Sequence, residues 1–235
     1  MASSKISISG SAIYASARSR RRDFIELSVA YGLILLVIWT PRPWQRILWW
    51  VAAAAVVAIA SLSFEGLQAM GLRRENFFRS SWIVGLAMLV SGVAVILAVW
   101  LRTLHVPSTP LLFFETYVGY IIWTFVQQLL LQCFFLVRLL RLLLSARLAA
   151  IVAALIFAAA HLPNPILVPA TLLWGLAACL LFLRYRNLYT LAIAHAILGV
   201  TLTITVPSAM HHNMRVGLGY LTYSRTHRTA PSAQP

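Results

Sequence analysis

Long apolar stretches, separated by short polar segments, make up most of the chain. Several of them are almost free of charge and approach or exceed the roughly 18 residues that a helix needs to cross a bilayer. This pattern predicts an all-α fold, a polytopic transmembrane helical bundle of about seven spans, within a range of about six to eight. The candidate spans are residues 24–40, 44–62, 81–101, 111–137, 147–161, 166–183 and 188–206.

The polar segments predict the connections between these spans. Pro41 and Pro43 separate the first two spans, and residues 65–79 are typical of a polar loop or an interfacial helix. The sequence Leu-Pro-Asn-Pro at 162–165 predicts a tight turn, because each proline disfavours helix at its own position and at the position before it. Residues 184–187 predict another short connection.

Three regions follow from this pattern. Residues 1–23 are Ser-rich and end in a run of arginines, which predicts a disordered basic N-terminal arm. Residues 24–206 form the predicted membrane domain. Residues 207–235 form a polar tail that contains His211 and His212, and this tail could either extend away from the membrane or fold back on it.

Composition supports a membrane protein. Of the 235 residues, 61% are hydrophobic and only 10% are charged, against about a quarter charged in soluble domains. A soluble fold of this size could not cover so much apolar surface. The net charge of +14 would suggest nucleic acid as a partner of a soluble protein, but here the arginines lie mostly between apolar stretches. We therefore expect the lipid bilayer, and no nucleic acid, as a partner.

The distribution of basic residues predicts the orientation. With a cytoplasmic N-terminus, thirteen of the 19 Lys and Arg residues fall on the cytoplasmic side and six on the other, as the positive-inside rule requires. We expect an integral membrane protein of the bacterial inner (plasma) membrane.

Polar side chains at bilayer depth are costly and are therefore candidates for function. Gln127, Gln128 and Gln132 lie on the fourth predicted span, His161 at the end of the fifth and His195 within the seventh. Gln128 and Gln132 are four residues apart and share one helical face. The structural alternative is that these side chains only join neighbouring helices, at about 1–2 kcal/mol or less per hydrogen bond.

The order and surroundings of these residues resemble the CAAX-protease and bacteriocin-processing (CPBP, or Abi) family of intramembrane endopeptidases. That family has Glu-Glu-x-x-x-Arg on one helix, Phe-x-x-x-His on the next and His-x-x-x-Asn on a later one. The resemblance covers residues 110–206. The corresponding residues here are Gln127, Gln128 and Gln132 for the first motif, Phe157 and His161 for the second, and His195 and Gly199 for the third.

The resemblance implies peptide hydrolysis near a prenylated C-terminus, or processing and immunity roles in bacteria. For active members of the family, the resemblance implies that a glutamate acts as the general base that activates water. The histidines and the asparagine then position the water or stabilise the oxyanion. Gln127 and Gln128 cannot accept a proton at neutral pH, so they cannot serve as that base. Gln132 lacks the charge of the arginine, and Gly199 lacks an amide.

A different base would have to act in this chain. Glu115 is the only acidic residue after position 75, but it precedes Gln127 by 12 residues, which is roughly 18 Å along a helix. A histidine could act as the base, because its unperturbed pKa of about 6.5 permits it. If only the glutamates of the family motif were replaced, its arginine would be a buried charge without a partner in a low dielectric, at a cost of several kcal/mol. Three amides together fit neutral recognition, a different proton path or a damaged site equally well.

Metal binding is the other chemical option. His161 and His195, with His211 or His212 as a third ligand, could hold Zn²⁺, which usually takes three or four ligands. The chain has no His-Glu-x-x-His spacing, so we expect no cofactor.

The predicted spans place the two site histidines at different depths. His161 falls near the outer end of its span, whereas His195 lies only about seven residues into its own, a difference of roughly 10 Å. A shared site therefore requires shifted boundaries or a tilted or broken helix.

The favoured hypothesis is a CPBP-type intramembrane endopeptidase that acts on membrane-anchored or lipidated peptides. The alternative is a non-catalytic pseudoprotease that binds a membrane peptide or a lipidated tail. The predicted catalytic residues are Gln127, Gln128, His161 and His195, with Gln132, Phe157 and Gly199 in support.

Overall fold

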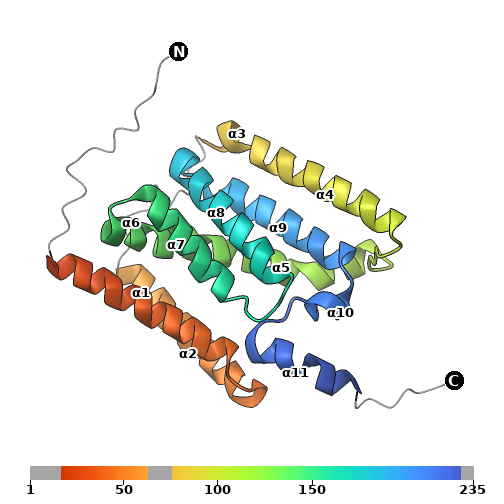
Figure 1. Ribbon diagram of the computed structural model, residues 1–235, viewed down its shortest axis with the longest axis horizontal. Coiled ribbons are helices and arrows are strands. Elements are labelled where there is room, and N and C mark those ends of the chain that lie inside the picture. Colours follow the sequence, from red (N-terminus) through yellow and green to blue (C-terminus); the bar gives the residue numbers. More distant parts are fainter. Residues whose placement is uncertain (1–16, 63–75, 229–235) are drawn as a thin grey trace.

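The computed structural model describes residues 17–62 and 76–228, and Figure 1 shows them as a bundle of helices. The described residues contain helices and no strands, which confirms the predicted all-α bundle. The helices are α1 (Ala17–Ile38), α2 (Arg42–Leu62), α3 (Phe77–Ser80), α4 (Trp82–Trp100), α5 (Pro110–Leu129), the π-helix η2 (Leu130–Leu136), α6 (Val137–Leu143), α7 (Ala146–Ala159), α8 (Leu167–Tyr185), α9 (Leu188–Thr205), α10 (Ser208–His211) and α11 (Gly217–Arg228).

All seven predicted apolar stretches coincide largely with helix. Within the described residues, four helical stretches are long and apolar enough to cross a membrane, and α7 is apolar but shorter. The polytopic character is therefore confirmed, while seven crossings stay a prediction. The four stretches are Phe77–Trp100, Pro110–Leu143, Leu167–Tyr185 and Leu188–Thr205.

Three predictions fall partly outside the described residues. These parts are residues 1–16 of the basic arm, residues 63–75 around the polar loop, and residues 229–235 of the tail. The described end of the loop forms the short helix α3, directly before α4.

Helix α1 begins earlier than predicted. The helix starts at Ala17, so the prediction of disorder is wrong for residues 17–23. Arg22 and Glu26, one turn apart, form an ion pair with 2.6 Å between Nε and Oε1. Arg20 donates a hydrogen bond to the Leu142 carbonyl at 2.8 Å. These contacts stabilise the first turns of the helix, and one of them comes from a residue more than a hundred positions away.

Further ion pairs fasten α1 to α6. Arg138 Nη2 lies 2.6 Å from Glu26 Oε2, and Arg141 Nη1 lies 3.5 Å from Asp23 Oδ1. Arg138 is only 3% exposed and also donates to the Phe134 carbonyl at 3.2 Å. Because a buried arginine is tolerated only when it is paired, these contacts fix α6 and, through it, the end of η2.

Helix α4 lies at one edge of the bundle and packs against α9 (Figure 1). One face of α4 is buried at helical spacing, through Ile83, Ala87, Ser91 and Ala98. Its other faces expose large apolar side chains, which a soluble monomer would rarely tolerate in such number. This exposed surface suits contact with lipid acyl chains, as expected of an integral membrane protein. The exposed residues include Leu86, Met88, Leu89, Val90, Val93, Ile96, Leu97, Val99 and Trp100.

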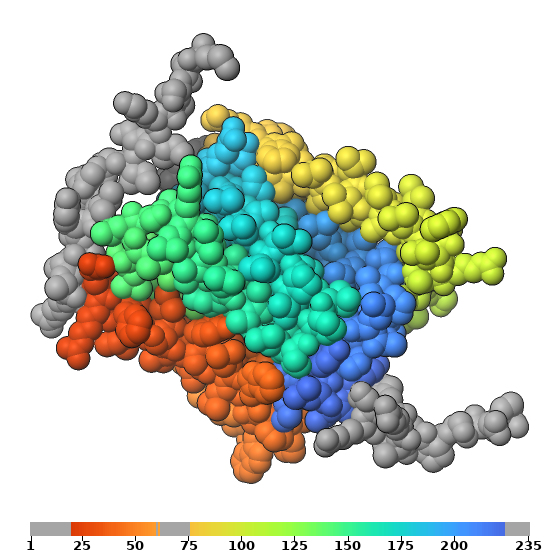
Figure 2. Space-filling model, viewed as in Figure 1, coloured from red at the N-terminus to blue at the C-terminus, as the bar shows by residue number. Residues whose placement is uncertain are grey.

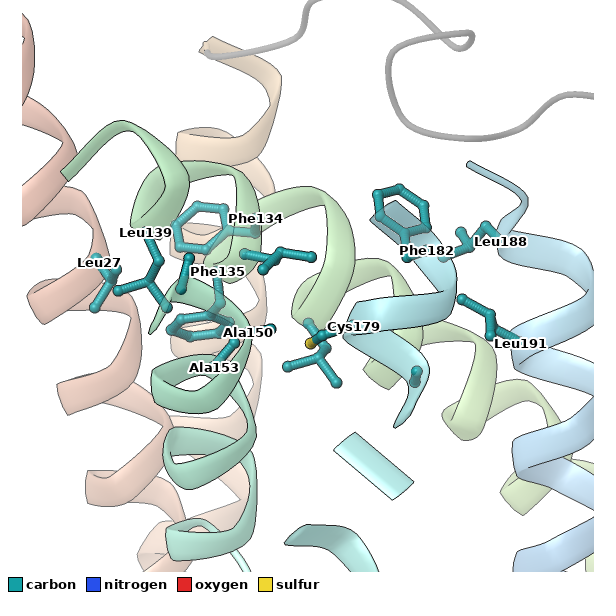
Figure 3. Close-up of a cluster of buried hydrophobic side chains, with 14 of the residues drawn as sticks. Leu27, Phe134, Phe135, Leu139, Ala150, Ala153, Cys179, Phe182, Leu188 and Leu191 are labelled. Carbon is teal, nitrogen blue, oxygen red and sulfur yellow. The ribbon is translucent and has the colours of Figure 1, made fainter. Parts of the chain in front are cut away.

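The buried core joins α1, α2, α4, η2, α6, α7, α8 and α9. Figure 2 shows the α7–α8 pair in the middle of one face, with α1 and α2 along one side and α4 along the other. Small residues on α7 allow close helix packing, as is common in membranes. Figure 3 labels ten residues of the core: Leu27, Phe134, Phe135, Leu139, Ala150, Ala153, Cys179, Phe182, Leu188 and Leu191.

Polar caps set where the site helices begin. The side chains of Thr109, Ser145 and Asn187 accept hydrogen bonds from backbone N–H groups three residues ahead, at 3.2, 3.4 and 3.1 Å. These caps start α5, α7 and α9. The residues that directly follow α6 and α8, Leu144 and Arg186, end these helices with positive φ of 54° and 49°. The register of the site residues therefore follows from local sequence.

Candidate functional site

A chain of hydrogen bonds links α5, η2 and α9. Gln132 Nε2 donates to Gln128 Oε1 at 3.2 Å, and Gln128 Nε2 donates to His195 Nδ1 at 3.1 Å. Both glutamines are fully buried, and His195 is 7% exposed. The structure thus brings three of the predicted residues into one network of uncharged groups.

The π-helix η2 starts two residues after Gln128 and contains Gln132. A π-helix is wider than an α-helix and occurs often at functional sites. Here it begins between the two hydrogen-bonded glutamines. The Gln132 amide also lies against the Cys179 thiol of α8. The sequence spacing predicted a shared face but not this change of helix type.

His161 lies in the turn that follows α7, two residues past the end of the helix. Its Nδ1–H donates to the Phe157 carbonyl at 2.7 Å, so the ring folds back along the helix. The Phe157 ring contacts both histidine rings, with centroids 4.9 Å from His161 and 6.0 Å from His195. The predicted conflict in depth is resolved because α7 ends at Ala159 and the His161 side chain returns by one turn.

These hydrogen bonds give the two histidines opposite chemical characters. A carbonyl only accepts, so the Nδ1 of His161 carries a proton, and the Nε2 of the neutral ring is an acceptor. The amide nitrogen of Gln128 only donates, so the Nδ1 of His195 accepts, and its Nε2 carries the proton. With this direction of the amide chain, His161 offers a base and His195 offers a donor.

Trp174 on α8 is a site residue that the sequence reasoning missed. Its ring lies 5.8 Å from that of His195. The buried Trp174 Nε1 and the buried Gln132 Oε1 have no hydrogen-bond partner among the described residues. Such groups usually cost about 1–3 kcal/mol each. An indole N–H in the middle of an apolar span is itself a polar group at bilayer depth, and that signal could have identified it.

The other predicted residues lie at the margin of this network. Gln127 is half-buried and takes no part in the chain of hydrogen bonds. Gly199 lies one turn after His195, in contact range of Tyr120 from α5. Glu115 is exposed near the start of α5, away from the glutamines, as expected from its spacing.

One of the comparisons with known proteins found a match. Residues 109–201 match the family model described as type II CAAX prenyl endopeptidase Rce1-like. The matched segment runs from α5 into α9 and includes Gln128, His161 and His195. This match supports the assignment of residues 109–201 to the CPBP family. No curated protein and no solved structure matches the chain.

The described part of the predicted tail, residues 207–228, folds back on the rest of the bundle (Figure 1). Asn164 Nδ2, in the turn after His161, donates to the carbonyls of His211 and Arg215 at 2.8 and 3.0 Å. Asn164 Oδ1 accepts from the N–H groups of residues 166 and 167 at 3.0 Å each. One fully buried side chain therefore caps α8 and ties the C-terminal segment to the turn beside His161.

We expect Asn164→Ala to destabilise the protein by about 2–3 kcal/mol, because it leaves two buried carbonyls and two helix N–H groups without their partner. Thermal unfolding of the purified protein in detergent measures this. Asn213→Gly is the control, because the Asn213 side chain makes an exposed hydrogen bond to the Tyr223 hydroxyl and glycine accepts its positive φ of 52°. Equal melting temperatures for the two variants would show that Asn164 does not hold the segment in place.

The two tail histidines are engaged within the C-terminal segment. His211 Nε2 donates to the Val206 carbonyl at 2.9 Å, and its Nδ1 accepts from the Met214 N–H at 3.0 Å. Burial lowers the pKa of His211, which favours this neutral ring. The His212 ring stacks on Tyr220 at 4.1 Å. Neither histidine joins the site.

No group of three or more His, Cys, Asp or Glu side chains that could hold a metal ion occurs within the part of the chain that the structure describes. The Zn²⁺ alternative needed His211 or His212 as a third ligand, and both lie in other contacts. Among the described residues, neither tail histidine therefore lies with His161 and His195.

Proposed function

We propose that this CPBP protein is an intramembrane endopeptidase in which His161, in place of a glutamate, is the general base. The hydrogen bond from His161 Nδ1–H to the Phe157 carbonyl carries this proposal. It fixes the ring and leaves Nε2 free to accept a proton from water. A backbone carbonyl commonly orients a histidine in this way when the other nitrogen acts.

His195 has the complementary role. Its Nδ1 accepts from Gln128, so its Nε2–H can donate to the carbonyl oxygen of a peptide. Such a donor is worth most in a dry site, where charge develops on that oxygen. Gln128 and Gln132 then act by positioning His195, and no carboxylate is needed.

The orphaned groups beside these residues support a peptide as the ligand. Trp174 Nε1 is an unpartnered donor and Gln132 Oε1 an unpartnered acceptor, and both are buried. A peptide amide has one acceptor and one donor, so it matches this pair chemically.

The wider setting supports a class of substrate and a location for the proposal. The family match and the long apolar helices support a membrane-anchored or lipidated peptide that enters from the bilayer. The excess of basic residues on one side supports a cytoplasmic N-terminus in a bacterial inner membrane.

A pseudoprotease that captures a membrane peptide or a lipidated tail is the second candidate. The observation that favours it is the neutral chain from Gln132 through Gln128 to His195, which can recognise an amide without activating water. This candidate predicts capture without product, and no gain of cleavage from Gln127→Glu combined with Gln128→Glu.

Hydrolysis of lipidated and membrane-anchored peptides by the purified full chain tests the proposal. We expect product from wild type and strongly reduced product from His161→Ala and His195→Ala. Equal turnover in all three proteins would contradict the proposed catalytic roles of both histidines. Binding of the same peptides without product would favour the pseudoprotease.

A further inference from the structure

Gly199 lies where a side chain from another helix approaches the backbone of α9. A Cβ at Gly199 would lie 2.6 Å from Tyr120 Cζ and 2.8 Å from Cε1, and would collide with the hydroxyl oxygen. Any residue other than glycine would therefore displace the end of the tyrosine ring. The close approach, and not backbone conformation, explains this glycine.

Helix α5 thus sends two side chains to the same partner helix. Gln128 reaches His195, and Tyr120 reaches Gly199, one turn farther along α9. Residues four apart lie on the same face of a helix. The Tyr120 hydroxyl is therefore on the His195 face of α9.

The Tyr120 hydroxyl makes no hydrogen bond to another described residue, and the side chain is only half-buried. Here the O–H group is a donor without an acceptor among the described residues, and it lies against Gly199, one turn along α9 from His195.

Resting on the proposed function, we propose that Tyr120 is a further catalytic residue that donates its O–H to the carbonyl oxygen of the peptide being cleaved. The water oxygen attacks the carbonyl carbon, and His161 Nε2 takes one water proton. The carbonyl electron pair moves to the oxygen, where the Tyr120 hydroxyl and His195 Nε2–H hold the negative charge. The C–N bond then breaks as the nitrogen takes the proton from His161, which gives a free acid and an amine.

The test is the hydrolysis rate of Tyr120→Phe on the same membrane-anchored peptide. The variant keeps the ring against Gly199 and removes only the hydroxyl. We expect kcat to fall by about 100-fold with little change in KM, because an oxyanion donor acts mainly in the transition state. Tyr117→Phe is the matched control, since Tyr117 is a buried tyrosine on the same helix that packs on Phe113. It should keep the wild-type rate.

A second pair of variants tests the geometry. Gly199→Ala should lose activity to a similar extent by pushing the ring aside, and Tyr120→Phe should add little further loss in its background. If wild type cleaves and Tyr120→Phe matches it in kcat, Tyr120 is a packing residue and this inference is overturned while the proposed function stands. If wild type is no faster than His161→Ala, the proposed function and the role of Tyr120 fail together.

Discussion

Gln132→Arg alone is expected to destabilise the protein by about 3–5 kcal/mol, and Gln128→Glu added to it should recover a large part of that loss. Gln132 is fully buried and contacts the Gln128 amide and the Cys179 thiol. An arginine there would be a buried charge with no carboxylate beside it. A glutamate at 128 would supply the missing partner across the 3.2 Å contact that now joins the two amides.

A double-mutant cycle of unfolding free energies measures this coupling. The four proteins are wild type, the two single variants and the double variant, unfolded reversibly in mixed micelles. Gln45→Arg is the control, because the half-buried Gln45 donates to the Val37 carbonyl and an arginine can do the same. If Gln132→Arg is as stable as wild type, the site is not closed to water. A double variant no better than the sum of the singles would show that the two positions do not interact.

Much of the fold follows from sequence because its causes are local. Apolar length gives the helices, and the two prolines in 162–165 give the turn after α7. The capping side chains Ser145 and Asn187 start the following helices where the pattern predicts them. The spacing of Gln128 and Gln132 also predicts their contact, although the helix there is a π-helix.

The features that sequence reasoning missed depend on contacts between distant positions. The early start of α1 follows in part from Arg138, 112 residues after Glu26. The return of the C-terminal segment rests on Asn164, whose partner carbonyls are about 50 residues away. From the sequence, Gly199 only lacks the amide of the family's asparagine. The packing of α5 on α9 shows that the Tyr120 hydroxyl lies where a side chain at position 199 would begin.

The second large effect is a loss of kcat that tests the separate roles of the two histidines, one as base and one as donor. His161→Asn should keep the fold, because the asparagine amide nitrogen takes the place of Nδ1 and can still donate to the Phe157 carbonyl. It cannot accept a proton at neutral pH. We therefore expect a stability within about 1 kcal/mol of wild type and a loss of about 100- to 10,000-fold in kcat.

His195→Asn is the matched variant. Its side-chain oxygen takes the place of Nδ1 and can accept from the Gln128 amide, while the Nε2–H donor is lost. We expect roughly a 100- to 1,000-fold loss in kcat with peptide binding retained. Melting temperature, peptide affinity and cleavage rate should be measured on the same preparations. A structural role for His161 predicts that His161→Asn cleaves like wild type, since the bond to Phe157 survives. That result would mean that another group is the general base and that the hydrogen bond to Phe157 only caps the end of the helix.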